Sequence, residues 1–400
     1  MSPDPQALKR SVLAYLDGRA GDLVELSHRV HESPEIGFEE ERSSRWCAER
    51  LEQGGLAVEM GICDLPTAFS AEAGSGPLTI AICCEYDALP GIGHACGHNV
   101  IASAAVGAGL ALAQLADDLG ITVRVLGTPA EEGGGGKILM LERGGFDGVN
   151  AAMMVHPAPG ELDRMPCLAV EHYDVVYRGK EAHASGYPDR GINAADALTV
   201  AQVAIGLLRQ QAEPLDQVHG IVTLGGAAPN IIPAHTEAKY YVRARDLARL
   251  ERWSPRVKAC FEAGAVASGA SLEIVPQGPT YSEFETDEQL AAAYVANATQ
   301  LGRLFPAPGG RSLNASTDMA NVSLVIPSIH PMLGLDCLPA VNHQPEFTAA
   351  AASPAADRAV LDGAAAMALT VVDLALDAAE RERLGSRTYS HLAADQPAGR

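Results

Sequence analysis

The sequence predicts an α/β fold in which a mostly parallel sheet is flanked by helices and a smaller α+β unit is inserted into the chain. Almost wholly apolar runs of strand length recur at residues 78–86, 122–127 and 150–155, as is typical of strands buried on both faces. Helical stretches separate these runs, and that alternation favours a parallel sheet. A chain of 400 residues also exceeds the usual size of a single core, so a second domain is expected.

The N-terminal part has the spacing of helices. Residues 7–53 alternate apolar and charged positions, and Pro34 and Gly37 interrupt them, which predicts an opening pair of helices. The apolar stretch Val100–Ala113 is rich in Ala and Gly and predicts a buried helix. We find no apolar run that reaches the ~18 to 20 residues of a membrane span, so no membrane partner is expected.

The rhythm changes near residue 168. Residues 168–179 alternate like a half-exposed strand. A helix, two strands, a second helix and a last strand are expected at 193–210, 218–226, 236–246, 247–267 and 271–277. The order βαββαβ is that of a compact unit able to fold as an insert, so we expect a first catalytic part at 1–167, an insert at 168–281 and a second catalytic part at 282–400.

Composition excludes one class of partner and indicates a compartment. The formal net charge of −21 argues against nucleic acid, because phosphate binding needs clustered Lys and Arg. The eight Cys show no framework spacing, which favours reduced thiols. The first residues lack the apolar stretch of a secretory signal, so the cytoplasm is the expected location.

Chemistry-bearing residues follow each predicted buried strand. "EYDALPGIGHACGHN" (85–99) follows the first, "TPAEEGGGG" (128–136) the second and "HPAPG" (156–160) the third. In open α/β sheets, ligands bind beyond the carboxyl ends of the strands, so these loops should converge. Convergence would bring together Cys96, His98, Glu131, Glu132 and His156.

Each motif has a less specific interpretation. Cys96 and His98 are spaced to reach one metal ion or two adjacent ones, but a buried Cys that has a His nearby by chance would show the same sequence pattern. Glu131 and Glu132 point in different directions, so one can coordinate a cation while the other faces a water. The glycines after them do not form a phosphate loop, because no Ser or Thr follows Lys137 and two carboxylates would repel phosphate.

Three single histidines are weak signals by themselves. His156 after an apolar run is typical of a core or surface histidine until other ligands are nearby. His183 lies in a polar loop before a helix that Asn193 can cap, and His343 lies in "NHQPEF". None of them identifies a site without its neighbours.

Five ordered motifs together resemble a known family. They are "EYDALPGIGHACGHN", "PAEEGGGGK", "AHAS…GINAADA", "APNIIPAHTEAKYYVRAR" and "STDMANVS", and they extend over nearly the whole chain. The chain resembles the family-20 metallopeptidases and amidohydrolases, in particular the branch of aminoacylase-1-like-2 and aminobenzoyl-glutamate hydrolase. The resemblance implies a dinuclear-metal aminopeptidase-like catalytic domain whose insert is a lid and dimerisation domain.

The resemblance also implies a metal centre. It implies two divalent metal ions per subunit, Zn²⁺ or Mn²⁺ with Co²⁺ also possible. The implied ligands are Cys96, His98, Glu132, His156 and His343. Asp87 would orient His98, and His330 is the rival of His343, because "NHQPEF" departs from the family's common His-Ser or His-Thr form. Residues 85–99 contain no Lys or Arg, so metal would supply the missing counter-charge.

Further roles follow from the resemblance. Glu131 would be the general base and His183 a donor to the oxyanion, supplied by the partner subunit in a homodimer. Asn230 and Arg243 match positions that hold the carboxylate end of the substrate. Two positions depart from the pattern of many relatives: Glu85 stands in place of a His ligand, and Asn99 in place of an Asp.

The expected function is hydrolysis of the amide bond of a small N-acyl amino acid, an aminobenzoyl-glutamate-like compound or a dipeptide, by attack of a water that the metal ions activate. One alternative is a non-catalytic, metal-containing ligand-binding protein on the same fold. A redox protein that uses Cys83, Cys84 and Cys96 is a third reading, although adjacent thiols in a buried strand are usually inert.

Overall fold

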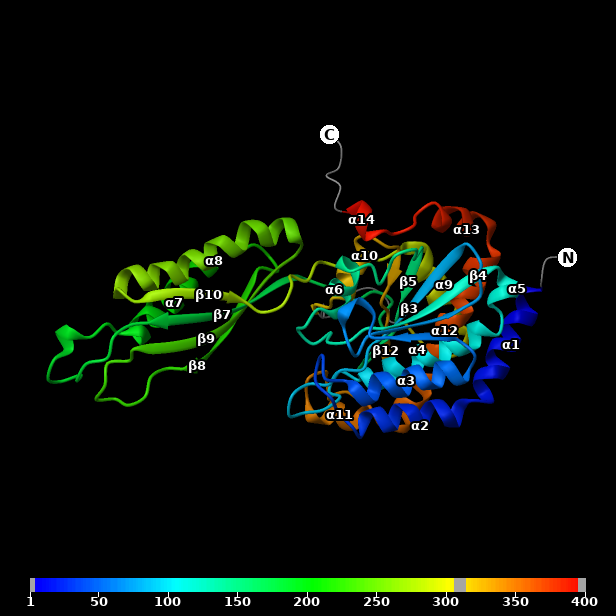
Figure 1. The fold of residues 1–400 in the computed structure, drawn as a ribbon, viewed down its shortest axis with the longest axis horizontal. Coiled ribbons are helices and arrows are strands. Elements are labelled where there is room, and N and C mark those ends of the chain that lie inside the picture. Colours follow the sequence, from blue (N-terminus) through cyan, green and yellow to red (C-terminus); the bar gives the residue numbers. More distant parts are fainter. Residues whose placement is uncertain (1–3, 306–313, 395–400) are drawn as a thin grey trace. The chain divides into compact units, whose positions relative to one another are not determined.

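The protein consists of two compact units. A computed structural model describes residues 4–305 and 314–394 (Figure 1). Among these residues, one unit contains 4–166, 284–305 and 317–394, and the other contains 167–283 and 314–316.

The second unit differs slightly from the insert expected at 168–281. It begins one residue earlier, ends two residues later and includes Asn314–Ser316 from the expected last segment. Hydrogen bonds explain the addition, because the Leu168 amide donates to the Ala315 carbonyl and the Ser316 hydroxyl donates to the Leu168 carbonyl at 2.7 Å. The returning chain therefore pairs with the start of the insert.

The first unit is built on a mixed, mostly parallel sheet. Its described strands follow the order β1-β2-β4-β3-β5-β11. Their bounds are β1 Ala57–Met60, β2 Phe69–Ala73, β3 Leu78–Cys84, β4 Ile121–Gly127, β5 Ala151–Met153 and β11 Ser328–Ile329. The pairs β4/β3, β3/β5 and β5/β11 are parallel, whereas β1/β2 and β2/β4 are antiparallel. Nearby, β6 (His156–Ala158) and β12 (Met332–Gly334) form a parallel pair. The predicted fold class is confirmed.

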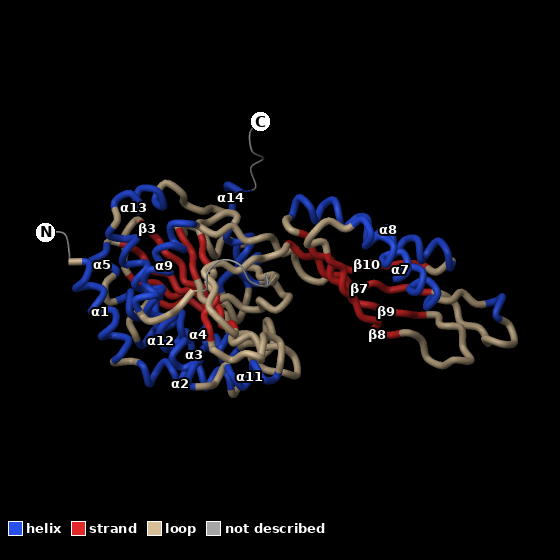
Figure 2. The backbone as a smooth tube through the Cα atoms, turned by 180° about the vertical axis from the view of Figure 1, so that it is seen from behind, coloured by secondary structure: helices blue, strands red, loops and turns tan. Residues whose placement is uncertain are grey.

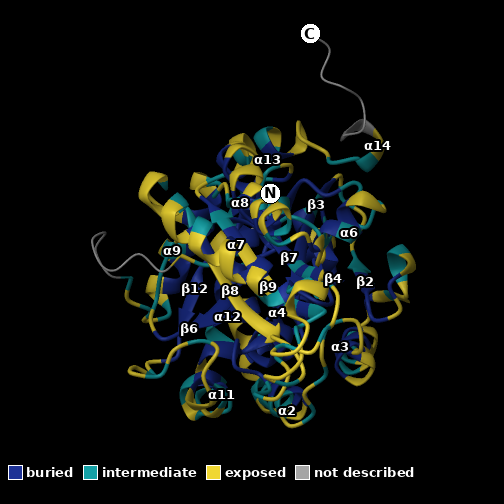
Figure 3. Cartoon of the chain, turned by 90° about the vertical axis from the view of Figure 1, so that its left-hand side faces the viewer, coloured by how far each residue is buried: buried dark blue, intermediate teal, exposed yellow. Residues whose placement is uncertain are grey.

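Both faces of this sheet are buried. Along β3, Ile80 and Ile82 lie in one hydrophobic core with residues of α2 (Ala20–His31), α4 (His98–Ala113) and α12 (Pro354–Leu376). Ala81 and Cys83 lie in a second core with residues of α6 (Gly136–Glu142) and α10 (Met319–Ser323). Successive side chains of a strand point to opposite faces, so a strand covered on both sides must be apolar throughout. The tube in Figure 2 shows helices on both sides of this sheet, and β3 carries mainly the buried colour in Figure 3, whereas the edge strand β1 is mostly exposed.

The helices of the first unit begin with three rather than the expected opening pair. The described helices are α1 Pro5–Asp17, α2 Ala20–His31, α3 Glu41–Gln53, α4 His98–Ala113, α5 Ala116–Leu119, α6 Gly136–Glu142, α9 Glu288–Gln300, α10 Met319–Ser323, α11 Pro345–Ala350, α12 Pro354–Leu376, α13 Ala378–Gly385 and α14 His391–Ala394, with a short 3₁₀ turn at Ile62–Asp64. The extra break comes at Gly18 and Arg19. The helical spacing of apolar and charged residues continues across Gly18 and Arg19, so the sequence pattern did not predict this helix boundary.

Contrary to the expectation from the sequence, one described helix, α12, is long and apolar enough to cross a membrane. However, 78% of its most apolar window is buried inside the structure. It packs on α4, where Gly107 admits it: a Cβ there would lie 2.9 Å from the Cβ of Ala364. α12 is therefore a core helix of the first unit.

The second unit is a four-stranded antiparallel sheet in the order β10-β7-β9-β8, with two long helices. Its elements are β7 Ala169–Arg178, α7 Ala194–Leu208, β8 Gln217–Leu224, β9 His235–Ala244, α8 Leu247–Ser268 and β10 Ser271–Pro276, with 3₁₀ turns at Pro188–Arg190 and Arg209–Gln211. Asn193 caps α7, because its side chain accepts from the Ala195 amide at 2.9 Å. Trp253 and Phe261 of α8 fill the core between helices and sheet.

Candidate metal centre

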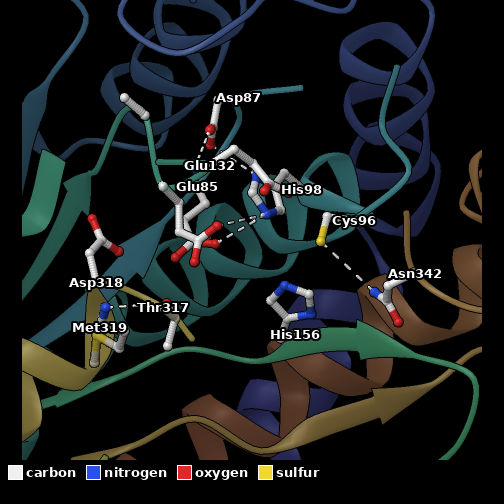
Figure 4. A network of polar contacts seen from close by, with 12 residues as sticks. Glu85, Asp87, Cys96, His98, Glu132, His156, Thr317, Asp318, Met319 and Asn342 are labelled. Atoms are coloured by element: carbon white, nitrogen blue, oxygen red, sulfur yellow. Dashed lines mark hydrogen bonds and ion pairs between the residues drawn. The ribbon is translucent and has the colours of Figure 1, made fainter. Parts of the chain in front are cut away.

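The loops after the buried strands of the first unit meet at one place. Glu85 and Asp87 follow β3, and Glu131 and Glu132 follow β4. Cys96 lies two residues before α4, and His98 is the first residue of that helix. His156 begins β6, and His343 precedes α11. Figure 4 shows Cys96, His98 and His156 facing a common space beside Glu85 and Glu132.

His98 is oriented by a carboxylate. Its Nδ1 lies 2.9 Å from Asp87 Oδ1, so that nitrogen carries the proton and donates. Its Nε2 then faces Glu85 Oε2 at 3.6 Å and Glu131 Oε2 at 3.9 Å. The preceding Gly97 has a φ of +76°, and a Cβ there would lie 2.9 Å from the Pro157 side chain, so the turn requires glycine.

Two groups of potential ligands share Cys96. One contains Cys96, His98 and His156, and the other contains Cys96, Glu132 and His343; within each group the ligand atoms lie within 4.8 Å of one another. His156 Nδ1 lies 2.8 Å from the Pro157 carbonyl, which leaves Nε2 as its ligand atom. His343 Nε2 lies 3.3 Å from Cys96 Sγ and 3.7 Å from Glu132 Oε1. Cys96 Sγ is therefore within 4.8 Å of the ligand atoms of both groups, and a thiolate and imidazoles are ligands that suit zinc.

Buried polar atoms support this interpretation. His98 Nε2, Glu85 Oε2 and Glu132 Oε1 are buried and have no hydrogen-bond partner in the described part of the chain. An unpaired buried polar atom is unfavourable unless a ligand, ion or water satisfies it. A thiol, imidazoles and carboxylates that converge in this way fit divalent cations such as zinc or manganese.

The electrostatics also favour added positive charge. Burial and the neighbouring Glu85 and Glu132 hold the pKa of Glu131 well above its usual range. Burial and Glu132 likewise raise the pKa of the Cys96 thiol. Burial acts to lower the pKa of His98, but Asp87 and Glu85 outweigh it and raise that pKa. The chain alone thus keeps protons on groups from which a bound cation would displace them.

The protein supplies one counter-charge itself, which the sequence analysis attributed to metal alone. Lys137 Nζ lies 2.5 Å from Glu85 Oε1 and 2.8 Å from Asp318 Oδ1, and all three side chains are fully buried. Burial acts to lower the pKa of Lys137, but Asp318 and Glu85 outweigh it and raise that pKa. In the sequence, the only signal for this role is the position of Lys137 at the end of the glycine run.

Glu40 is a buried carboxylate that the sequence did not single out. Its Oε1 accepts from the Ala130 amide at 2.8 Å and its Oε2 accepts from the Thr67 hydroxyl at 2.9 Å. Burial, with repulsion from Asp87, raises the pKa of Glu40 to about 7. The folded protein therefore binds this proton more tightly than the unfolded chain does.

A pH dependence of stability follows. The stabilisation from the Glu40 proton is fully present below about pH 4.5, the ordinary pKa, and is lost as the pH rises through about 7. The free energy of unfolding of metal-free wild type and of Glu40→Gln is measured in urea at pH 5 and at pH 8. From pH 5 to pH 8, wild type should lose on the order of 2 kcal/mol of stability relative to the variant. Glu35→Gln is the control, since hydrogen bonds from Ser43 and Arg42 outweigh burial and lower the Glu35 pKa. No movement in Glu40→Gln would contradict the raised pKa.

Two further positions have defined places in the first unit. His330 lies 5.4 Å from His156, ring centre to ring centre, and both its nitrogens are buried without a hydrogen-bond partner among the described residues. His330 belongs to none of the described ligand groups, whereas His343 does. Asn99 donates to the Ser27 hydroxyl and the Ala351 carbonyl, so it ties the start of α4 to neighbouring elements.

The expected substrate residues lie in the second unit. His183 is exposed, and its Nδ1 accepts from the Gly186 amide at 3.1 Å, which leaves Nε2 as the donor. Asn230 is next to it, because the Asn230 carbonyl accepts from the Ala184 amide. Arg243 donates to the Ser316 hydroxyl at 2.5 Å and has no ion pair with a described carboxylate, and burial lowers its pKa. Its guanidinium retains capacity for an anion.

Comparison with known proteins identifies the family. The model of peptidase family M20/M25/M40 matches residues 82–371. The chain belongs to this family. It is 38% identical to an Xaa-Arg dipeptidase of Mus musculus, over 92% of this chain and 89% of that protein. It is 32% identical to a p-aminobenzoyl-glutamate hydrolase component of Escherichia coli strain K12, over 62% of this chain and 56% of that protein.

A solved structure shares the fold. A dinuclear metal-binding peptidase of the M20 family from Bacillus subtilis superposes with a TM-score of 0.63 at 23% identity, over 89% of this chain and 99% of that one. The resemblance found in the sequence is confirmed. The protein is accordingly a hydrolase of the M20 family, a group of metal-dependent enzymes that act on amide and peptide bonds.

Proposed function

We propose that this M20 protein hydrolyses the amide bond of a small N-acyl amino acid, an aminobenzoyl-glutamate-like compound or a dipeptide. The observation that carries the proposal is the pair of ligand groups that share Cys96, with Glu131 beside them. Cys96, His98, Glu132, His156 and His343 would hold two divalent ions, Zn²⁺ or Mn²⁺ with Co²⁺ as a further option. When bound, the ions would lower the pKa of a water and polarise the amide carbonyl.

The residues of the chain would do the rest of the chemistry. Glu131 would accept the proton of the attacking water and pass it to the leaving amine. Asp87 would fix the direction of His98 through Nδ1, as its 2.9 Å contact supports. His183 would donate from Nε2 to the oxyanion that develops on the carbonyl.

The second unit would recognise the carboxylate of the substrate. Arg243 can form a bidentate pair with a carboxylate, and Asn230 would add a hydrogen bond. The unmatched charge of Arg243 in its half-buried position supports this role.

We also propose a homodimer in which the inserted unit of one copy serves as lid for the other and supplies His183. The edge strand β8 exposes Ile221, Val222 and Leu224, and α7 exposes Val203 and Leu207. An edge strand with apolar side chains is suited to pair with a second copy. The cytoplasmic location remains a prediction.

A substrate panel tests the function. The panel contains N-acyl amino acids, aminobenzoyl-glutamate and dipeptides. Each compound is tested both with its free carboxylate and as the matching carboxamide. The protein is loaded with Zn²⁺, Mn²⁺ or Co²⁺, incubated with each compound, and the products are separated. We expect metal-dependent release of the amino acid, with a strong preference for the free carboxylate. Arg243→Ala should raise KM for the carboxylate form by at least about tenfold, since a hydrogen bond to a charged group contributes about 1.5–3 kcal/mol. Absence of hydrolysis across the panel contradicts the function; equal use of both forms contradicts the carboxylate site.

A further inference from the structure

The backbone just before the two glutamates is in an unusual conformation. Ala130 has a φ of +55°, in the left-handed region that residues other than glycine rarely adopt. Such a conformation persists only where the surrounding structure enforces it, and it commonly marks a functional site. Because Ala130 precedes Glu131 and Glu132 directly, its conformation sets the direction in which both side chains leave the chain.

Glu40 and Gly37 enforce this conformation from one side. Glu40 is fully buried, and its Oε1 accepts from the Ala130 amide at 2.8 Å. Its other oxygen is held by the Thr67 hydroxyl at 2.9 Å. Gly37 packs so closely that a Cβ there would lie 2.8 Å from the Cβ of Ala130. The segment before α3 is therefore built against this one residue of the loop.

A second carboxylate holds the same loop from the other side. The Glu132 amide donates to Asp87 Oδ2 at 2.9 Å, while Asp87 Oδ1 orients His98. Glu40 and Asp87 thus accept from the amides of Ala130 and Glu132, and Glu131 lies between the two anchors. The loop that carries the proposed base and one proposed ligand is fixed at both ends by buried carboxylates.

We propose that Glu40 is a positioning residue for the metal centre. By holding the Ala130 amide it fixes the left-handed turn, and through the backbone it aims Glu132 at the ligand group and Glu131 at the neighbouring space. The hydrogen bonds of the Glu40 carboxylate go to the Ala130 amide and the Thr67 hydroxyl, and neither residue is one of the proposed metal ligands. The inference rests on the proposed function for the role of Glu132 as a ligand.

The test compares two glutamates of one segment. Glu35 is the matched control, because its carboxylate accepts from the amides of Arg42 and Ser43 at the start of α3 and does not contact the loop. Glu40→Ala and Glu35→Ala are prepared as full chains, and affinity for Zn²⁺ and Mn²⁺ is measured by chelator competition at pH 8. Glu40→Ala should bind metal at least about tenfold more weakly, the loss typical of removing a partner that orients a ligand. Glu35→Ala should bind as wild type does.

Rescue and reference variants separate the possible explanations. Glu40→Gln retains an amide oxygen for the Ala130 amide and should recover most of the affinity. Metal binding by Glu40→Ala equal to that of Glu35→Ala overturns the inference, even where both variants melt earlier. Where Glu40→Ala does not fold, Thr67→Val keeps Glu40 but removes one of its hydrogen bonds and should show a smaller loss in the same direction; unchanged affinity there also overturns it.

Glu132→Gln distinguishes this failure from failure of the proposed function. If Glu132→Gln weakens metal binding and Glu40→Ala does not, only the positioning role is wrong. If Glu132→Gln binds metal as wild type does, the proposed ligand set is wrong, and with it the basis of the inference.

Discussion

Replacing Glu131 with Gln will lower kcat by about 10²- to 10⁴-fold and leave metal content unchanged. Loss of a positioned general base typically has an effect of this size. Gln keeps the shape of the side chain but cannot accept the proton of the attacking water. Glu131 Oε2 lies 3.9 Å from His98 Nε2, close enough to serve a water in the same cluster. Steady-state kinetics on the best substrate of the panel, with metal analysis of the same sample, measures both quantities.

The neighbouring Glu132 provides the matched control. Glu132→Gln is the same chemical change one residue along, but Glu132 lies in the potential ligand group with Cys96 and His343, whereas Glu131 lies in a separate group with Glu85 and His98. It should therefore weaken metal binding, and added metal should restore part of the activity. Unchanged turnover in Glu131→Gln would remove the proposed base. Loss of metal from Glu131→Gln to the same extent as from Glu132→Gln would make Glu131 a ligand.

Replacing Cys96 with Ala should disturb both of the proposed metal ions at once, because two potential ligand groups contain Cys96. Losing a residue that merely orients a ligand typically weakens metal binding about 10- to 100-fold, and a thiolate shared by two ions should contribute more than that. We expect both metal-binding steps to weaken and turnover to fall to background. Metal titration with a competing chelator, together with metal content after desalting, measures this.

Single-group variants sharpen the Cys96 result. His156→Ala should affect one binding step and His343→Ala the other, because each lies in only one of the two groups. Cys260→Ser in the second unit controls for loss of a thiol as such, since the Cys260 thiol donates to the Arg256 carbonyl of its own helix, lies in the core of the second unit and belongs to neither ligand group. Two normal binding steps in Cys96→Ala would exclude a bridging role.

The site owes much to residues that are far apart in the sequence. Lys137 and Asp318 are separated by 181 positions, yet they form one buried ion cluster with Glu85. A charged residue in the sequence is by default a solvated one, so nothing local indicated that Lys137 would be buried. Lys137 is needed as a counter-charge only because the loop before α10, which carries Asp318, packs against the glycine run in the folded protein.

The two histidines near the C-terminal end show the same limit. The sequence leaves His330 and His343 as rivals, because "NHQPEF" departs from the common His-Ser or His-Thr form of the family that the chain resembles. In the structure His343 has a φ of +68°, its amide donates to the Ala95 carbonyl, and its ring lies beside Cys96. His330 stacks on His156 instead. Which of the two rings lies beside Cys96 depends on the backbone turn at His343, and no local sequence pattern predicts that turn.

The sequence by itself determined the fold class, the order of elements in the insert and the loops in which the chemistry lies. It did so because burial on both faces of a sheet writes an apolar run into each strand, and parallel strands place their carboxyl ends at one edge. Only the tertiary structure decided which groups contact the buried charges. Lys137 pairs with Glu85, the Glu132 amide donates to Asp87, and the Ala130 amide donates to Glu40. Those contacts join segments that are far apart in the sequence. The partners of a buried carboxylate are the donors around it in space, so its neighbours along the chain do not predict them.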